Sequence, residues 1–357
     1  MTRRGAAAFV LKILILKPSS LGDVVQTLPV LRLLKLHFHD AEIFWWIDAK
    51  LAPLLQDDPD LTGVIRFERQ RWAAPRHWPE MFRSIQWMRA QHFDWVIDLQ
   101  CLIRSGAFAW LANGTFLIGL DDSREGARGF YDLAVRRPSF HTHAADWYLA
   151  VLPQLGVPVH NHFQWLPERP NAFAEIKRKW LEMSGNPKSE IQNPKCIALQ
   201  PGARWANKRW PVEYFAELVR LLAQKSPDAR FTVLGSAEDQ PLGEIISRVE
   251  PERCFNLCGQ TSLPEMIEWI RLCDLMITND TGPMHVASAL GKPLVALFGP
   301  TEPRRTGPYR QLDGVMRIDL PCSPCLKSRC HYEKKNECLN ALSPAAVVEF
   351  ACQKFRG

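Results

Sequence analysis

Short apolar runs alternate with longer amphipathic stretches along the whole chain. A short apolar run bounded by polar or turn residues is typical of a buried strand, and apolar residues spaced three and four apart indicate a helix. The first half contains five such strand patterns, at residues 12–17, 43–47, 64–67, 95–99 and 116–120. The second half contains five more, at residues 196–200, 231–235, 254–257, 275–278 and 294–298. Helical patterns lie between them, so the sequence predicts an α/β protein with parallel sheets that helices cover on both faces.

The length of 357 residues suggests two domains rather than one. The least regular stretch, roughly Pro153–Pro194, is rich in proline, asparagine and charge, and we place the linker within it. The predicted organisation is a doubly wound, Rossmann-like domain at residues 1–165, a linker at 166–194 and a second such domain at 195–343. A C-terminal helix at 344–357 could cross back to the first domain. In doubly wound sheets, ligands bind beyond the carboxyl ends of the strands.

Composition indicates a globular protein without a membrane span. Hydrophobic residues make up 46% and charged residues 23% of the chain. No apolar run approaches the roughly 20 residues of a spanning helix. The first ten residues faintly resemble a signal peptide, but Lys12 interrupts the apolar run and no small-residue cleavage site follows, so we expect a cytoplasmic protein. The formal charge of +6 favours phosphates or anionic lipid surfaces as partners. It does not require nucleic acid, and we expect no nucleic-acid partner.

An arginine- and tryptophan-rich segment occupies residues 66–89. Side chains of both kinds combine an apolar body with a polar or charged end, so this segment could rest peripherally on a cytoplasmic membrane surface or bind a phosphorylated glycolipid. A solvated helix with buried tryptophan anchors is the alternative.

The stretch from residue 277 to residue 303 is the most informative part of the chain. It reads as a buried strand, a tight Asp280-Thr281-Gly282 turn, a short helix that contains His285, and a second buried strand. Backbone N–H groups at such a helix start coincide with the positive end of the helix dipole, so the turn suits an anion. An ordinary strand-to-helix junction, with Gly282 needed only for the turn, is the alternative.

The loop Lys17-Pro-Ser-Ser-Leu-Gly-Asp23 follows the first predicted strand. Ser20 and Gly22 allow a tight turn, and Asp23 lands near the start of the next helix. Asp23 could be a general base that takes a proton from a nucleophile. Alternatively, it could be an N-terminal helix residue that the helix dipole favours. The loop is not a nucleotide fingerprint, since neither G-x-G-x-x-G nor a P-loop occurs in the chain.

A cationic loop at residues 200–211 follows the first strand of the second half. Gly202 permits close backbone approach in this loop. Three cations share it: Arg204, Lys208 and Arg209. Such a loop could clamp a diphosphate against the helix start at 280–282, and a solvated basic loop is the alternative. After the next strand, Glu238 could bind ribose hydroxyls or cap the helix that follows.

Four motifs in this order and spacing together resemble the lipopolysaccharide heptosyltransferases of glycosyltransferase family 9. They are Ser19-Ser-Leu-Gly-Asp23, Pro201-Gly-Ala-Arg-Trp-x-x-Lys-Arg-Trp-Pro211, Asn279-Asp-Thr-Gly-Pro-Met-His285 and Phe298-Gly-Pro-Thr-x-Pro303. The resemblance extends from about residue 12 to residue 345. It implies the GT-B fold, in which two Rossmann-like domains face a central cleft. It also implies an inverting transfer of heptose from ADP-heptose to a sugar hydroxyl on a lipid A–Kdo glycolipid of the inner core.

The resemblance also assigns roles to matching positions. Asp23 matches the catalytic base, Lys208 the diphosphate-binding lysine, and Glu238 a nucleoside-contacting acidic position. The donor site would further include Arg204 and the phosphate-loop residues Asp280, Thr281, Gly282 and His285. No catalytic metal is required in this scheme, and the sole Asp-x-Asp sequence, Asp58-Pro-Asp60, lies in a turn-like stretch that is a poor metal site.

The predicted acceptor site lies in the first domain. Residues 94–100 and 119–125 resemble acceptor-domain segments of the same family. Arginines near these segments could contact phosphate or carboxylate groups, and residues of the Asp23 loop would share the site. The candidate acceptor contacts are Ser20, Gly22, Arg104, Arg124 and Arg128.

Ten cysteines in a chain expected to be cytosolic argue for free thiols. Six are scattered through strand and helix patterns and are expected to be small core residues. The other four form a cluster with the spacing of a close pair and two further thiols: Cys322, Cys325, Cys330 and Cys338. The cluster could hold a structural Zn²⁺ or an iron ion, could remain free thiols on a loop, or could form a redox-labile pair.

Three functions therefore remain open from sequence. The first is a heptosyltransferase, and the second is a GT-B glycosyltransferase with another donor or with a protein or different glycan as acceptor. The third is a sugar-nucleotide-binding protein without catalysis, in which Asp23 would only start a helix. The presence of both Asp23 and Lys208 favours an enzyme. A dehydrogenase is disfavoured because no glycine-rich dinucleotide turn occurs.

Overall fold

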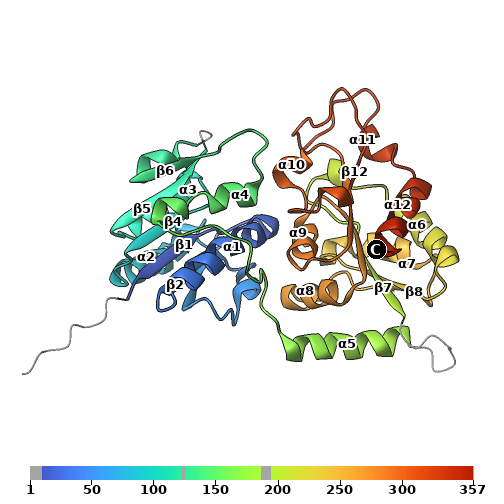
Figure 1. Ribbon diagram of the computed structural model, residues 1–357, viewed down its shortest axis with the longest axis horizontal. Helices are drawn as coiled ribbons and strands as arrows, with labels where there is room; N and C mark the ends of the chain where they lie inside the picture. Colours follow the sequence, from blue (N-terminus) through green and yellow to red (C-terminus); the bar gives the residue numbers. More distant parts are fainter. Residues whose placement is uncertain (1–9, 123–124, 186–193, 357) are drawn as a thin grey trace, which may run out of the picture. The chain divides into compact units, whose positions relative to one another are not determined.

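The computed structural model describes residues 10–122, 125–185 and 194–356. The chain divides into two compact units, Met1–Pro167 and Glu168–Gly357. Each unit contains a six-stranded parallel sheet with helices packed on it, as Figure 1 shows. The predicted fold class, α/β with two doubly wound sheets, is confirmed.

The sheet of unit 1 is built from the strands predicted in the first half, with one more at its edge. In chain order the strands are β1 (Lys12–Leu16), β2 (Glu42–Asp48), β3 (Gly63–Phe67), β4 (Trp95–Asp98), β5 (Phe116–Asp121) and β6 (Leu133–Arg136). They lie in the order β3-β2-β1-β4-β5-β6. The helices are α1 (Leu21–His37), α2 (Trp78–Ala90), α3 (Ile103–Leu111) and α4 (Ala144–Leu149). Strand order therefore reverses between β1 and β4, where doubly wound sheets bind ligands.

Unit 2 repeats this arrangement. Its strands are β7 (Lys195–Gln200), β8 (Ala229–Val233), β9 (Cys254–Asn256), β10 (Leu275–Asn279), β11 (Leu294–Phe298) and β12 (Val315–Arg317). They lie in the order β12-β11-β10-β7-β8-β9, so the reversal falls between β7 and β10. The helices are α5 (Pro170–Ser184), α6 (Val212–Lys225), α7 (Gln240–Ser247), α8 (Leu263–Leu272), α9 (Gly282–Ala289), α10 (Pro303–Thr306), α11 (Glu337–Asn340) and α12 (Pro344–Arg356).

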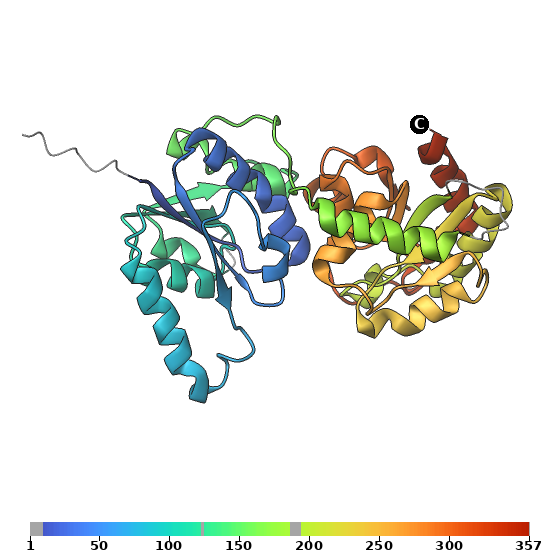
Figure 2. The same cartoon turned by 90° about the horizontal axis from the view of Figure 1, so that it is seen from below.

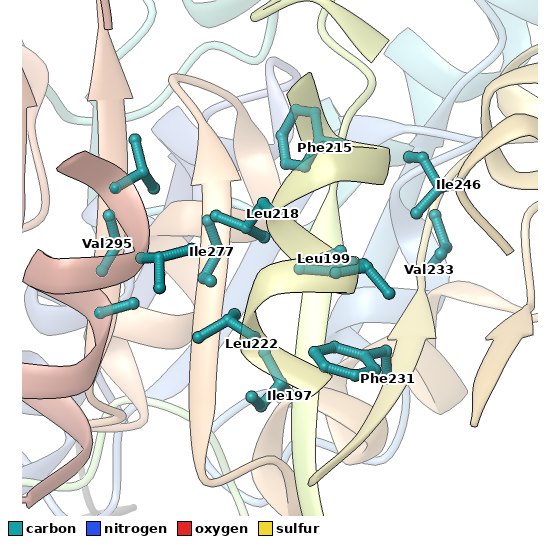
Figure 3. Close-up of a cluster of buried hydrophobic side chains, with 14 of the residues drawn as sticks. Ile197, Leu199, Phe215, Leu218, Leu222, Phe231, Val233, Ile246, Ile277 and Val295 are labelled. Atoms are coloured by element: carbon teal, nitrogen blue, oxygen red, sulfur yellow. The ribbon is translucent and has the colours of Figure 1, made fainter. Parts of the chain in front are cut away.

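The core of unit 2 explains why its strands read as unbroken apolar runs. Side chains from the strands interdigitate with the apolar face of α6, as Figure 3 shows for Leu199, Ile277, Leu218 and Leu222. These four side chains are almost completely buried. Helix α12 packs on α6 and on strands β10 and β11 in the same unit. Burial of this apolar area is the main stabilising contribution to the sheet that positions the loops described below.

The segment expected to be a linker contains a long helix of unit 2. Helix α5 packs along α8, and Lys179 on α5 forms an ion pair with Glu265 on α8, with 3.0 Å between Nζ and Oε1. The two units join in sequence at residues 167 and 168. Among the described helices, none is both long and apolar enough to cross a bilayer.

The Asp58-Pro-Asp60 turn has a structural role. The Arg32 guanidinium on α1 donates to both Asp58 oxygens at 2.6 Å and to Asp60 Oδ2 at 2.6 Å. The side chains of Arg32 and Asp58 are 6% and 1% exposed. Both carboxylates are therefore engaged by a buried arginine, which fastens the loop before β3 to α1.

We expect Asp58→Ala to lower the free energy of unfolding by about 3–5 kcal/mol, because the substitution leaves the buried Arg32 charge without its main partner. Urea denaturation monitored by circular dichroism measures the change. The matched control is Glu42→Ala, which removes the partly exposed ion pair with Lys12 and should cost less than about 1 kcal/mol. An equal decrease in the free energy of unfolding for the two variants would contradict a stabilising role for the Arg32 ion pair.

Candidate active site

Asn279 holds the loop after β7 in place at the position where the strand order of the unit 2 sheet reverses. This residue ends β10, and its side-chain amide donates to the Pro201 carbonyl at 2.7 Å and accepts from the Trp210 backbone N–H at 3.1 Å. Asn279 is fully buried. Both ends of the predicted cationic loop are thus fixed to the strand that precedes Asp280.

Lys208, Asp280 and Thr301 come from three predicted motifs and meet in the structure. Lys208 Nζ lies 2.6 Å from Asp280 Oδ2, and the Thr301 hydroxyl donates to the same oxygen. Asp280 is 5% exposed and the Lys208 side chain 18% exposed. The ammonium also lies over the Trp205 ring, 4.9 Å from its centroid. Lys208 is therefore positioned by a buried carboxylate and an aromatic face, while part of its side chain still reaches the surface.

Helix α9 begins immediately beyond this ion pair. Thr281 precedes the helix in extended conformation, Gly282 is its first residue, and Pro283 follows. The first N–H groups of a helix have no partner within it, so they can bind an anion beside Lys208. Gly282 does not have the left-handed φ that Gly259 and Gly291 adopt, so the turn itself does not require glycine. His285 is buried on the same helix, at 9% exposure.

Two further predicted donor residues, Arg204 and Glu238, are exposed. Glu238 lies in a short 3-10 helix, and its proposed alternative as a helix cap is wrong. Asp239, not Glu238, directly precedes α7, and its Oδ2 caps the 3-10 helix Ala237–Asp239 by accepting from the Ser236 backbone N–H at 3.0 Å and hydroxyl at 2.9 Å. Gly202 packs closely against this carboxylate, because a Cβ at Gly202 would lie 2.5 Å from Asp239. The close backbone approach expected at Gly202 is thus to a neighbouring loop of the protein.

In unit 1, Asp23 is the third residue of α1 and caps its start. Asp23 Oδ2 accepts from the Ser20 backbone N–H at 3.0 Å and from the Ser20 hydroxyl at 2.6 Å. This is the helix-start role considered from sequence. The second oxygen makes a contact that capping does not explain, because the Tyr148 hydroxyl donates to Asp23 Oδ1 at 3.1 Å. The Asp23 side chain remains partly accessible.

Sequence reasoning did not identify Tyr148 or Lys17 as site residues. Lys17 ends the buried run of β1, and its Nζ donates to the Leu99 carbonyl at 2.7 Å and to the Tyr148 hydroxyl at 3.1 Å. Burial raises the pKa of Tyr148 well above its ordinary value, and the Asp23 carboxylate adds to the effect. A lysine at the end of an apolar strand was a usable signal. Tyr148 offered none, since it is 125 residues from Asp23 along the chain.

A second buried carboxylate lies at the end of β4. Asp98 accepts from the Tyr131 hydroxyl at 2.7 Å and from the Gln100 backbone N–H at 2.9 Å. Burial raises the pKa of Asp98, although these hydrogen bonds oppose the effect. The Gln100 side chain accepts from the Ser19 backbone N–H at 3.4 Å. The β4 loop is thereby connected to the loop that carries Asp23.

The candidate acceptor residues differ in exposure. Ser20 is exposed, whereas Gly22 is buried. Arg104 is exposed on α3, and Arg128 is exposed on the 3-10 helix Ala127–Phe130, which packs against α3. Arg128 pairs with Asp121, with 3.1 Å between the guanidinium and the carboxylate. Arg124 lies outside the described residues.

The cysteine cluster occupies a loop beside the donor-site motifs. The Ser323 hydroxyl donates to the Gly299 carbonyl at 2.7 Å, and the Asn207 side chain donates to the Lys327 carbonyl at 2.8 Å. This loop therefore supports both the turn that carries Thr301 and the loop that carries Lys208. Its distance along the sequence from the other motifs concealed this contact.

Cys338 is close enough to the other three cysteines of the cluster for their thiols to affect its pKa. Burial raises the pKa of Cys338 to about 11, with added repulsion from the other three thiols: Cys330, Cys322 and Cys325. Within residues 10–122, 125–185 and 194–356, no three His, Cys, Asp or Glu side chains are grouped so that they could hold a metal ion. Of the cysteines expected to be core residues, Cys352 is half-buried and the others are buried: Cys101, Cys196, Cys254, Cys258 and Cys273.

Comparison with known proteins agrees with these motifs. The family model described as glycosyltransferase family 9 (heptosyltransferase) matches residues 81–336. The lipooligosaccharide heptosyltransferase 2 of Campylobacter jejuni is 28% identical over 346 residues, which cover 96% of this chain and 97% of the relative. The lipopolysaccharide heptosyltransferase 2 of Salmonella typhimurium is 30% identical over 325 residues, covering 86% and 88%.

A solved structure shares the fold. The Escherichia coli ADP-heptose lps heptosyltransferase II superposes with a TM-score of 0.75 at 24% identity, covering 97% of this chain and 99% of that chain. The two Rossmann-like units are therefore those of the GT-B class of glycosyltransferases.

Proposed function

Because this chain belongs to glycosyltransferase family 9, the heptosyltransferase family, and is a glycosyltransferase, we propose that it transfers heptose from ADP-heptose to the lipopolysaccharide inner core. The acceptor in this proposal is a sugar hydroxyl of a lipid A–Kdo glycolipid. The relatives from Campylobacter and Salmonella are named as heptosyltransferases of lipooligosaccharide and lipopolysaccharide, and the E. coli structure is named for ADP-heptose. The observation that carries the proposal is the meeting of Lys208, Asp280 and Thr301 beside the start of α9.

The donor binds unit 2 in this proposal. The diphosphate takes the place beside the Lys208 ammonium and the first N–H groups of α9, at Thr281 and Gly282. Asp280 holds the ammonium in position, and His285 lies on the same helix. Arg204 adds a second cation to the diphosphate, and Glu238 accepts hydrogen bonds from the ribose hydroxyls.

Asp23 is the catalytic base in this proposal. The acceptor hydroxyl oxygen attacks the anomeric carbon of the heptose while the bond from that carbon to the ADP oxygen breaks. Asp23 takes the hydroxyl proton, and ADP leaves with the electron pair of the broken bond. A single displacement of this kind inverts the configuration at the anomeric carbon.

The leaving diphosphate needs positive charge, which protein groups can supply without a metal ion. The Lys208 ammonium and the dipole of α9 are fixed before the reaction, so they stabilise developing negative charge with little rearrangement. We therefore propose that the transfer proceeds without a catalytic metal.

The acceptor binds unit 1 in this proposal. Arg104 and Arg128 lie on adjacent elements and can contact phosphate or carboxylate groups of the glycolipid. Arg124 is proposed to do the same, and Ser20 and Gly22 line the approach to Asp23.

Helix α2 is proposed to bring the enzyme to its membrane-borne acceptor at the inner face of the cytoplasmic membrane. Trp78 and Phe82 on this helix are 47% and 53% exposed, and Figure 2 shows the helix extending outward from unit 1. Arg83 and Arg89 are exposed on the same helix. No acidic residue occurs between Glu80 and Asp94. Exposed aromatic and cationic side chains together suit an anionic lipid surface.

We expect Asp23→Ala to reduce turnover at least about a hundredfold while ADP affinity stays within a few-fold, because general-base catalysis typically contributes such factors. Turnover is measured by mass spectrometry and ADP affinity by calorimetry. Full activity in Asp23→Ala would contradict the base assignment.

Lys208→Ala should weaken ADP binding, both by loss of the cation and because the Asp280 carboxylate would then repel the diphosphate. The double variant Lys208→Ala with Asp280→Asn separates these effects, and should recover part of the affinity. The matched control is Arg248→Ala, which removes an exposed cation beyond the far end of α7. Equal ADP affinity in Lys208→Ala and Arg248→Ala would contradict the donor assignment.

Replacing both Trp78 and Phe82 by serine should weaken binding to phosphatidylglycerol vesicles by about tenfold or more, since each aromatic side chain contributes apolar burial. Vesicle sedimentation measures the binding, and turnover on a detergent-solubilised acceptor should change little. Leu181→Ser, which alters an exposed leucine on α5, is the matched control. An equal loss of vesicle binding in the Trp78 and Phe82 variant and in Leu181→Ser would contradict a specific role for α2.

A structural Zn or Fe ion at the four cysteines is a proposal separate from the transfer chemistry, and it requires these thiols to move closer together than they lie in the described structure. If it is correct, plasma mass spectrometry of protein purified without chelators will find about one ion per chain, as expected for a four-thiolate site. The Cys322→Ser, Cys325→Ser double variant will then lose this ion. A fully active protein that is purified without bound metal would contradict this proposal.

A further inference from the structure

A chain of hydrogen bonds connects the interior of unit 1 to the Asp23 carboxylate. Lys17 Nζ donates to the Leu99 carbonyl and to the Tyr148 hydroxyl, at 2.7 Å and 3.1 Å. The Tyr148 hydroxyl in turn lies 3.1 Å from Asp23 Oδ1. Lys17 and Tyr148 are 3% and 5% exposed. These contacts join the ends of β1 and β4 to α4 and to the first turn of α1.

The donors in this chain determine where each proton lies. The lysine nitrogen donates to both of its oxygen partners, so the Tyr148 oxygen acts as acceptor toward Lys17. The single Tyr148 proton is then directed to the Asp23 carboxylate, which in its ionised form can only accept hydrogen bonds. These hydrogen bonds together therefore favour the negatively charged form of Asp23, the form that a general base requires.

Neighbouring contacts hold Tyr148 in this position. The preceding residue, Trp147, donates from its indole to the Val135 carbonyl at 3.1 Å, which fastens α4 to β6. His143 caps the start of α4 by accepting from the Ala145 backbone N–H at 3.1 Å. The Lys17 ammonium also lies against the Tyr148 ring, 4.4 Å from its centroid. A group fixed before the substrate binds can orient Asp23 without further loss of conformational entropy.

We propose that Lys17 and Tyr148 are positioning residues that keep the Asp23 carboxylate ionised and oriented toward the acceptor hydroxyl. This inference rests on the proposed role of Asp23 as base. Neither residue contacts the substrate in this scheme, and both act through Asp23. Removal of the Tyr148 hydroxyl should raise the pKa of Asp23, because the charged form loses a hydrogen-bond donor.

The hydrogen bonds from Asp23 through Tyr148 to Lys17 do not carry the abstracted proton away. Transfer beyond Tyr148 would require Lys17 to accept a proton, and a lysine ammonium has no acceptor site. The proton taken from the acceptor hydroxyl therefore stays on Asp23 until it exchanges with solvent through the partly accessible carboxyl group.

Other titratable or charged groups also act on this network. Cys101, in the loop after β4, and Asp23 itself both raise the pKa of Tyr148, whereas Arg137 lowers it. Burial is the largest cause, so Tyr148 stays protonated across the working pH range and remains a donor. The Ser20 contacts are made to Asp23 Oδ2, so a Tyr148 variant should leave them in place. The experiment therefore isolates the contribution made through Oδ1.

The test compares the pH dependence of kcat/KM for Tyr148→Phe and Lys17→Met with that of the unmodified enzyme. The acid limb of this profile reports the pKa of the free enzyme's base. We expect the limb to move upward by about one pH unit in Tyr148→Phe, which corresponds to about tenfold lower activity below the limb. Lys17→Met should move it in the same direction.

Tyr131→Phe is the matched control. It also removes the hydroxyl of a mostly buried tyrosine that donates to an aspartate, but that partner is Asp98. Tyr131→Phe can lower stability, but the acid limb of its kcat/KM profile should stay at the same pH. An unmoved limb in both Tyr148→Phe and Lys17→Met, or an equal shift in Tyr131→Phe, would overturn the proposal.

A second readout separates this proposal from the assignment of the base. The pKa of Asp23 can be followed by NMR of the ¹³C-labelled carboxyl carbon, with its signal identified by its loss in Asp23→Asn. A higher Asp23 pKa in Tyr148→Phe supports the network even if Asp23 proves not to be the base. An unchanged pKa overturns the network even if Asp23→Ala abolishes turnover.

Discussion

The reversal of strand order beside the first strand of each sheet is the constraint on which the rest of the structure depends. Parallel strands direct all their carboxyl ends to one edge, and the reversal sends the neighbouring connections to opposite faces. In unit 1 the reversal brings Lys17 to Leu99, and in unit 2 it brings Lys208 beside Asp280. The apolar cores shown for unit 2 in Figure 3 hold these strand ends in register.

The two strand reversals have different electrostatic character. In unit 2 a buried carboxylate holds a lysine beside a helix start, so the local charge favours an anion. In unit 1 a buried lysine acts through a tyrosine on an aspartate, so the local charge favours an ionised carboxylate. In the proposed reaction, unit 2 holds the leaving diphosphate and unit 1 accepts the proton. Glycosyl transfer by displacement requires both.

Much of the fold could be predicted from sequence because buried parallel strands leave unbroken apolar runs. Ten of the strands were recognised in this way, whereas β6 (Leu133–Arg136) and β12 (Val315–Arg317) were not, because they are short edge strands that are only partly buried. Helix α5 was assigned to a linker because its flanking residues are rich in proline and charge. Its packing on α8 could not be foreseen from local pattern.

The candidate site was only partly visible in the sequence for a related reason. Lys208, Asp280 and Asp23 lie in glycine- and proline-marked loops next to strands, where the motif itself is informative. Tyr148 reaches Asp23 only through the packing of α4 on α1, and the cysteine loop reaches the donor motifs only through tertiary hydrogen bonds. Contacts between segments so distant along the chain leave no periodicity or spacing to detect.

We propose that this chain transfers heptose from ADP-heptose without a catalytic metal. The most direct measurement incubates the purified protein with ADP-heptose and a lipid A–Kdo acceptor in excess EDTA and follows the acceptor by mass spectrometry. We expect a mass gain of a single heptose, with inverted configuration at the new linkage by NMR. No transfer in EDTA, restored by added Mg²⁺ or Mn²⁺, would contradict metal independence. No transfer under any condition, with ADP still bound, would contradict the proposed donor sugar or acceptor.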